Sequence, residues 1–232
     1  MIYPSLKKTP IKEIVFSISY DEIVDKACFK KFIGLENISK RFDDIKPTMV
    51  LSITNEGIKQ TEDNSSYHLR NVNEVLQLRK GSFSYHYLND YCEYGEILKN
   101  LMSLWSDFNT QIKDSLTLTS ISVRYINVLE IDDENTPSRL VQLYPKYSSD
   151  RDIINFQNSV QFKYQKFPEY LINVVSTKPQ KEIVLLDITV NKNVSNENLK
   201  STTLEDLFKP LQEIKNRAFF DSITAKALIK YI

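Results

Sequence analysis

Hydrophobic and polar positions alternate with a period of two along several segments of this chain. A period of two is typical of β-strands with one buried face, because successive side chains of a strand point to opposite sides. The first such segment is 13–20, whose apolar positions are Ile14, Phe16, Ile18 and Tyr20. We therefore predict a half-buried strand over 13–20.

Two pairs of alternating segments flank turn residues, and each pair predicts a β-hairpin. Segments 49–54 and 58–61 enclose the turn residues 55–57, and segments 75–79 and 82–87 enclose Lys80 and Gly81. Short connections that contain glycine between two strands favour antiparallel pairing. We expect these four strands to form an antiparallel meander.

Apolar residues recur every three to four positions in two other segments, which indicates amphipathic helices. One is 23–42, where Gly34 is positioned to divide the run in two. The other is 95–113, which carries a wide apolar stripe of Leu98, Leu101, Trp105, Phe108 and Ile112. A stripe of that width predicts packing on a sheet.

Residues 117–131 form the longest β-type run, and apolar side chains fall on both of its predicted faces. Ile121, Val123 and Tyr125 share one face, whereas Ile126 and Val128 share the other with Arg124. We therefore expect both faces of this strand to be covered. Asn127 is three positions from Arg124, so the two side chains should point to opposite sides.

The clearest linker is 132–137, which is acidic and then continues with Asn, Thr and Pro. It predicts an N-terminal α+β part, 1–131, and a C-terminal α+β part, 138–232, packed as one compact unit. The second part should hold a short helix near 139–143 and three strands at 156–164, 170–177 and 182–191. The apolar run 183–188 suggests that the last of these strands is central.

The end of the chain carries helix signals. Thr202 with Glu205 three residues later predicts a capping box, and the helix it begins should kink or restart at Pro210. A final short helix is expected at 225–231 after Ser222 or Thr224. The fold class predicted is α+β, with antiparallel sheet or sheets, packed helices and two similar halves.

Charge and composition exclude several functions. Thirty basic and thirty acidic residues cancel, so no overall field draws the chain toward nucleic acid or an anionic membrane. Cys28 and Cys92 lack metal-site spacing and are expected to be reduced thiols. The first ten residues do not resemble a signal peptide, and no apolar run is long enough to span a membrane. We expect a cytoplasmic protein.

Motifs of the common enzyme classes are absent from the sequence. The four glycines are scattered singly, so there is no phosphate-binding glycine loop, and no GxSxG sequence occurs. The triplet Glu213-Ile214-Lys215 falls on a predicted helix, whereas a metal-dependent nuclease would place such a triplet on a strand. We predict no catalytic residues, no metal site and no cofactor.

Arg124 and Asp187 are charged residues on otherwise apolar predicted strands, one in each part of the chain. Each would be costly to bury alone, so we predict that they pair across the sheet. The alternative is that Arg124, Asn127 and Asp187 contribute to a ligand or partner site.

A second group of candidates is the ring-rich segment that contains Tyr85, His86, Tyr87 and Tyr91. Rings and an imidazole in one segment can stack on bases or form a hydrolytic site, although ordinary core packing is the simpler interpretation. His68 stands alone in the polar stretch 61–73, which we expect to be a surface loop.

Four short blocks resemble a sporadically distributed family of uncharacterised bacterial proteins. They are TPIKEIVFSI at 9–18, VRYIN at 123–127, LLDI at 185–188 and AFFDSIT at 218–224. Ser122-Val123 stands where the family pattern has Gly-Leu. The resemblance implies no known activity, and the patchy distribution of the family implies bacterial defence or mobile-element genes.

From these observations we predict a non-catalytic interaction, sensor or scaffold protein of a bacterial defence or mobile-element module. Its partner would be another protein or a second copy of itself, because neither a membrane nor nucleic acid is indicated. The alternative is an uncommon enzyme that acts on nucleotides or nucleic acid through the segment from Tyr85 to Tyr94.

Overall fold

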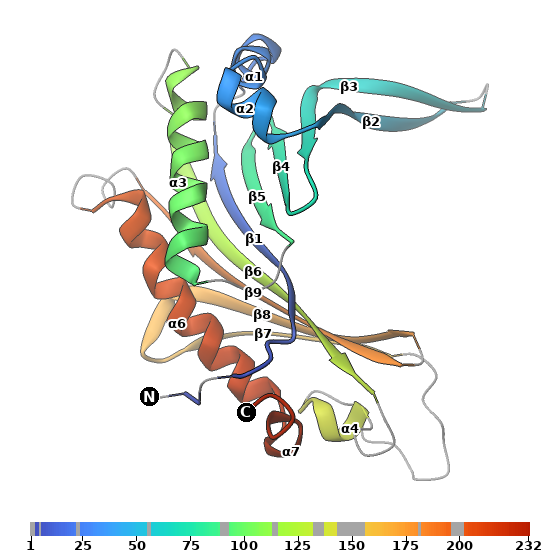
Figure 1. Ribbon diagram of the computed structural model, residues 1–232, viewed down its shortest axis with the longest axis vertical. Coiled ribbons are helices and arrows are strands. Elements are labelled where there is room, and N and C mark those ends of the chain that lie inside the picture. The colour runs from blue at the N-terminus through green and yellow to red at the C-terminus, as the bar shows by residue number, and fades with distance from the viewer. Residues whose placement is uncertain are drawn as a thin grey trace.

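A computed structural model describes residues 3–4, 6–21, 24–54, 57–88, 93–112, 116–131, 137–142, 156–180, 182–195 and 202–232. Nine antiparallel strands form a single sheet in the order β2-β3-β4-β5-β1-β6-β9-β8-β7 (Figure 1). The strands are β1 (Ile11–Tyr20), β2 (Asp44–Thr54), β3 (Gly57–Arg70), β4 (Glu74–Arg79), β5 (Ser82–Tyr87), β6 (Leu118–Glu130), β7 (Gln157–Tyr164), β8 (Phe167–Gln180) and β9 (Ile183–Asn193). The predicted α+β class and antiparallel sheet are confirmed.

Two long helices, α3 and α6, lie along one side of this sheet (Figure 1). The described helices are α1 (Lys26–Ile33), α2 (Glu36–Arg41), α3 (Tyr94–Thr110), α4 (Pro137–Leu140), α6 (Leu204–Ser222) and α7 (Ala225–Leu228). Helix α6 packs on β6 and β9, and α3 packs on β5 and α6. The predicted helix 95–113 corresponds to α3, and the helix predicted after the capping box at 202–205 corresponds to α6.

The order of elements repeats within the sheet. Strand β1 is followed by the helical pair α1 and α2, by a meander from β2 that returns to β1 through β5, and then by α3. Strand β6 is likewise followed by α4, by a meander from β7 that returns to β6 through β9, and then by α6. The two halves meet where β1 pairs with β6, so the sheet is continuous between them.

The core lies between the sheet and the helices, and it explains why the alternating pattern is so regular. Phe16 on β1 pairs with Tyr85 on β5 and with Val123 on β6, and all three are fully buried. The ring of Phe16 also packs edge-on against Phe208 of α6, with 5.6 Å between centroids. Burial of this one face supplies most of the driving force for folding.

The opposite face of the sheet carries small polar side chains. Ser17 of β1 pairs with Ser84 of β5 and with Ser122 of β6, and the Ser17 and Ser84 hydroxyls are 2.9 Å apart. We call this the open face. The prediction that both faces of the 117–131 strand are covered was wrong, since Arg124 on this face is exposed. Apolar residues at 126 and 128 gave a misleading signal because their strand neighbours shield them in part.

Three further expectations need correction. His68 lies within β3, paired with Lys46 and Gln77, and not in a loop, because the hairpin strand runs on through the polar residues. The cap of α6 is Thr203, whose hydroxyl accepts a hydrogen bond from the Asp206 backbone N–H, one residue later than predicted. Pro210 lies inside an unbroken α6, so the helix does not restart there as predicted.

Two further local predictions are confirmed. The 23–42 run divides at Gly34 into α1 and α2, and Thr224 caps α7 by accepting a hydrogen bond from Ala227. The linker at 132–136 and residues 143–155 lie outside the described residues. Within the described part of the chain, no helix is both long and apolar enough to cross a membrane.

Candidate functional site

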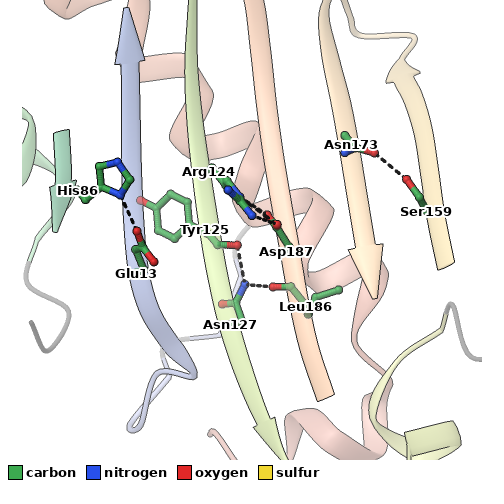
Figure 2. Close-up of polar contacts among 9 residues, drawn as sticks. All are labelled: Glu13, His86, Arg124, Tyr125, Asn127, Ser159, Asn173, Leu186 and Asp187. Carbon is green, nitrogen blue, oxygen red and sulfur yellow. Dashed lines mark hydrogen bonds and ion pairs between the residues drawn. The ribbon is translucent and has the colours of Figure 1, made fainter. Parts of the chain in front are cut away.

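Arg124 and Asp187 meet across β6 and β9 on the open face, as predicted (Figure 2). Arg124 Nε donates to both carboxylate oxygens of Asp187 at 2.9 Å, and Nη2 donates to Oδ2 at 2.5 Å. The hydrogen bonds to Asp187 raise the pKa of Arg124. The Arg124 side chain remains 48% exposed, so the pair is a surface ion pair and not a buried one.

His86 also lies on the open face, two strands from Arg124 (Figure 2). Its Nδ1 is 2.6 Å from Oε1 of Glu13 on β1, and this hydrogen bond lowers the pKa of Glu13. The Nε2 atom of His86 is buried and has no hydrogen-bond partner in the described structure. The pair therefore holds the imidazole by one nitrogen only.

Tyr85 points to the other side and belongs to a buried polar network. Its hydroxyl donates to Glu74 Oε1 at 2.5 Å, and Arg41 donates to the same carboxylate through Nε at 2.8 Å and Nη2 at 2.6 Å. Burial, followed by the hydrogen bond to Glu74, raises the pKa of Tyr85. Tyr85 is fully buried. Its hydroxyl therefore satisfies a buried carboxylate and is not available to a ligand.

The ring-rich segment does not form one cluster. Strand alternation places Tyr85 and Tyr87 on the helix side and His86 on the open face, and Tyr87 is half-buried beside the core. Tyr94 begins α3 and donates its hydroxyl to the Phe208 carbonyl at 2.8 Å. Tyr91 lies outside the described residues. The described rings thus have separate roles.

Asn127 is a predicted site residue that lines a cavity. It is 2% exposed on the helix side of β6, opposite to Arg124 as expected. Its amide nitrogen donates to the Leu186 carbonyl at 2.9 Å and approaches the Tyr125 carbonyl at 3.4 Å (Figure 2). Because two carbonyls face the nitrogen, the amide oxygen points away from them.

The cavity has a volume of about 450 Å³ and lies between the N-terminal segment, β6 and α6. Most of its wall is apolar or aromatic, and Pro10, Ile11 and Phe219 are examples. Its polar side chains include Asn127 and Lys215. We call it the Lys215 cavity. Volumes of this size accommodate small organic molecules.

Lys215 is the unusual member of this wall. It projects from α6 toward the sheet, is 6% exposed, and places Nζ 3.8 Å from the centroid of the Tyr125 ring. Burial lowers the pKa of Lys215 to about 7. No aspartate or glutamate lines the cavity among the described residues. Among the residues that the structure describes, the wall around this amine therefore supplies no matching negative charge.

Charged groups beside the cavity are already engaged with one another. Asp221 accepts a hydrogen bond from the Tyr164 hydroxyl at 2.6 Å, and Arg217 lies 4.1 Å above the Tyr164 ring. Tyr3 stacks on Phe220 with 4.6 Å between ring centroids, and both rings line the cavity. These contacts place an aromatic wall next to the lysine without neutralising it.

Residues from the segments 9–18, 123–127, 185–188 and 218–224 lie in or beside this cavity. Blocks 9–18 and 218–224 both supply lining residues, and block 123–127 supplies Asn127 and the Tyr125 ring. Block 185–188 supplies the Leu186 carbonyl that holds the Asn127 amide. Segments far apart in the sequence therefore converge on one place.

Lys215 was not predicted as a site residue, although the sequence carries a signal for it. Lys215 is four positions after Leu211 and three before Ala218, both of which are buried on the face of α6 that packs on the sheet. A lysine in the centre of an apolar helical stripe predicts a buried amine.

A second cavity, of about 500 Å³, lies beside Arg41, Asn71, Glu74 and Tyr87. Its Glu74 carboxylate already accepts hydrogen bonds from Asn71 and Arg41. In the part of the chain that the structure describes, no cluster of three or more metal-binding side chains occurs. The Lys215 cavity is the better candidate site.

No protein-family model and no curated protein matches this chain. Among solved structures, a similar one is the crystal structure of the di-domain ARO/CYC StfQ from the steffimycin biosynthetic pathway. The TM-score is 0.18 and the identity 8%, over 90% of this chain and 95% of that chain. A TM-score that low carries no argument. We therefore describe the class of this protein by its fold alone. It is an α+β protein whose nine-stranded antiparallel sheet carries long helices on one face and a cavity that contains a lysine.

Proposed function

We propose that this chain is a non-catalytic binding protein of the sensor type, which takes a small organic molecule into the Lys215 cavity. The observation that carries this proposal is a buried amine, with its pKa lowered to about 7, on the wall of a 450 Å³ cavity. Buried ionisable groups reduce stability, and groups with perturbed pKa values in cavities are enriched at functional sites.

Two other parts of the sequence-based prediction concern the partner and the genetic setting of this protein. A protein partner or self-association remains a prediction from composition, and the open face is where such a partner has room to bind. The setting in a bacterial defence or mobile-element module is supported by the family resemblance alone.

The proposal is tested by ligand capture with a matched pair of variants. Asn216 lines the cavity, whereas Glu213 is exposed on the same helix. Asn216→Trp should fill the cavity, and Glu213→Trp should place the same ring in solvent. Native mass spectrometry of the purified chain, followed by thermal melts with a metabolite library, reports binding as a retained mass or a raised Tm.

We expect wild type and Glu213→Trp to bind the same compounds and Asn216→Trp to lose them. Absence of any bound compound in wild type would refute the proposal. Equal binding by Asn216→Trp would also refute it, because the ligand would then lie elsewhere.

A second candidate function, an enzyme that uses Lys215 as a nucleophile, is favoured by the same lowered pKa. A neutral amine attacks a carbonyl carbon, and the carbonyl oxygen leaves as water when the imine forms. Borohydride then delivers hydride to the imine carbon and leaves a stable secondary amine. Incubation with acetaldehyde or pyruvate and borohydride should label Lys215, and not Lys215→Met, if this candidate is correct; an unlabelled wild type excludes it for these probes.

A further inference from the structure

We propose that the ligand of the Lys215 cavity is a small organic monoacid, whose carboxylate pairs with the Lys215 ammonium and whose apolar part lies against Phe219 and Phe220. This inference rests on the proposed function, since it assigns the chemical class of the molecule that the cavity binds. Four features of the site support it.

The first feature is the unmatched charge. Lys215 and the phenol of Tyr3 are the ionisable groups of the described wall, and no carboxylate accompanies them. The nearby Asp221 is engaged by Tyr164 and lies 3.8 Å from Arg217, so it is not the partner of Lys215. A ligand carboxylate would supply the counter-charge that the protein omits.

The second feature is the small number of cationic and backbone donors that the cavity wall offers to an anion. A phosphate dianion is usually held by several donors, such as arginine or a glycine-rich loop of backbone N–H groups. The wall of the Lys215 cavity contains one lysine, no arginine and no glycine among its described residues. One ammonium matches one carboxylate.

The third feature is the apolar wall. Phe219 and Phe220 are consecutive on α6, Tyr3 stacks on Phe220, and Leu6, Pro10 and Ile11 complete the apolar surface. Such a surface favours a hydrocarbon or aryl group on the ligand, because each buried CH₂ contributes roughly 0.8 kcal/mol in transfer measurements. The ligand is therefore amphipathic, with one acidic end.

The fourth feature is Asn127. Its amide nitrogen is committed to the Leu186 carbonyl, so the group it can offer the ligand is the amide oxygen, an acceptor. An acceptor favours a hydroxyl or N–H on the ligand and disfavours a second carboxylate nearby. This restricts the acid to one negative charge.

Binding of such an acid is coupled to proton uptake. Above pH 7 part of the Lys215 amine is neutral in the free protein, because burial lowers its pKa to about 7. A bound carboxylate favours the ammonium form, so the complex takes up a proton. Among the described residues, the other titratable groups at this site are the Tyr125 phenol on β6, whose ring Lys215 contacts, and the Tyr3 phenol on the N-terminal segment, which lines the same cavity. Burial raises the pKa of Tyr3, so it stays neutral across this range.

The test compares acids with their uncharged amides on the intact chain. Hexanoate and phenylacetate are the probes, and hexanamide and phenylacetamide match them in size. Isothermal titration at pH near 8, in two buffers of different ionisation enthalpy, gives the affinity and the number of protons taken up. We expect each acid to bind wild type at least about tenfold more tightly than its amide, with uptake of nearly one proton.

The affinity for the acid should also fall about tenfold for each pH unit above the pKa of free Lys215, as long as the complex stays protonated. Lys215→Met should bind acid and amide alike, and Lys209→Met, an exposed lysine of the same helix, should behave as wild type. The wild-type comparison does not depend on either variant.

The outcomes separate this inference from the proposed function. Equal affinity for acid and amide, or binding without proton uptake, overturns the inference and leaves the cavity as a ligand site. Tighter binding of phenyl phosphate than of phenylacetate overturns it as well. Failure of every acid and amide to bind overturns the inference, and the proposed function is then decided separately by the Asn216→Trp and Glu213→Trp comparison.

Discussion

The Nζ atom of Lys215 lies 3.8 Å from the centroid of the Tyr125 ring, at the junction of α6 and β6. A ring face attracts an ammonium group, typically by about 0.5–2 kcal/mol. Burial of the amine opposes its charged form and lowers the pKa of Lys215 to about 7. Lys215 is therefore a buried amine beside an aromatic ring, in a site that opposes its charged form.

The first prediction is that Lys215→Met is more stable than wild type at neutral pH. Between the lowered pKa of about 7 and the ordinary value of 10.5, the unfolded chain binds more protons than the folded chain. The unfolding free energy of wild type therefore rises with pH across this window. We expect the variant to gain about 1–3 kcal/mol at pH 7, with the gain gone near pH 10.5.

Denaturant unfolding at several pH values measures this difference, and Lys209→Met is the control. Lys209 is exposed and paired with Asp206, so its removal should change stability by at most about 0.5 kcal/mol. A Lys215→Met protein that is less stable than wild type at every pH would contradict the prediction, since the lysine would then be a net stabilising residue.

The second prediction compares two arginine–carboxylate pairs that differ in burial. Arg124 is 48% exposed beside Asp187, whereas Arg41 is 26% exposed beside a Glu74 that is 11% exposed. Arg41→Met leaves a largely buried carboxylate and should lower stability by about 2–4 kcal/mol. Arg124→Met should lower it by only about 0.5–1.5 kcal/mol, because the Arg124 pairing is screened by water and Asp187 is 20% exposed, against 11% for Glu74.

Double-mutant cycles with Glu74→Gln and Asp187→Asn measure the two coupling energies directly. We expect the larger coupling at Arg41 and Glu74. Equal couplings would mean that burial does not decide the strength of these pairs. The sequence alone predicts Arg124 and Asp187 to be buried charges, with a large cost for leaving either one unpaired.

The contrast between the correctly predicted pairing of Arg124 and its wrongly predicted burial shows what strand alternation can and cannot predict. Alternation assigns residues to the two faces of a strand, so it predicted that Arg124 and Asn127 point to opposite sides. It does not say which face receives a helix, because that depends on the strand order and on where α3 and α6 pack. Arg124 was therefore paired correctly but placed in the wrong environment.

The cavity was harder to predict than the strands for a related reason. Its wall combines Pro10, Asn127 and Phe219, which are about a hundred residues apart in the sequence. Only the pairing of β1 with β6 and the packing of α6 on β6 bring them together. The prediction of a surface loop around His68 was wrong for a different reason. The polar residues of 61–73 gave no alternating pattern, so the continuation of strand β3 could not be recognised in the sequence.

The third prediction concerns the buried hydroxyl of Tyr85. Burial alone would raise the pKa of Glu74, but hydrogen bonds from Arg41, Tyr85 and Asn71 outweigh it and the pKa is lowered. A lowered pKa means that the carboxylate stabilises the fold above its ordinary pKa of 4.5 and that this stabilisation is lost as the pH falls. Tyr85→Phe should lower stability by about 1–3 kcal/mol near pH 7.

The same variant should also begin to lose stability at a higher pH than wild type, because Glu74 has one donor fewer. Acid unfolding followed by circular dichroism measures the midpoint. Tyr87→Phe is the control, since Tyr87 lies on the same side of β5 and is half-buried. An unchanged acid midpoint in Tyr85→Phe would show that its hydroxyl contributes nothing to the charged form of Glu74.

The fourth prediction concerns Pro210, the seventh residue of the unbroken helix α6. Proline has no N–H, so the hydrogen bond that this position would make to the Asp206 carbonyl is absent, and its ring crowds the preceding turn. The packing of Leu207, Phe208 and Leu211 on the core keeps the helix continuous across this point. Pro210→Ala should restore the missing bond and raise the unfolding free energy by about 1–3 kcal/mol, because the position is only half-buried and alanine is the strongest helix former.

Thermal melts of Pro210→Ala and of Gln212→Ala, a half-buried position two residues later, separate the proline effect from general helix propensity. An equal or lower Tm for Pro210→Ala would mean that the proline ring contributes packing that outweighs the lost hydrogen bond.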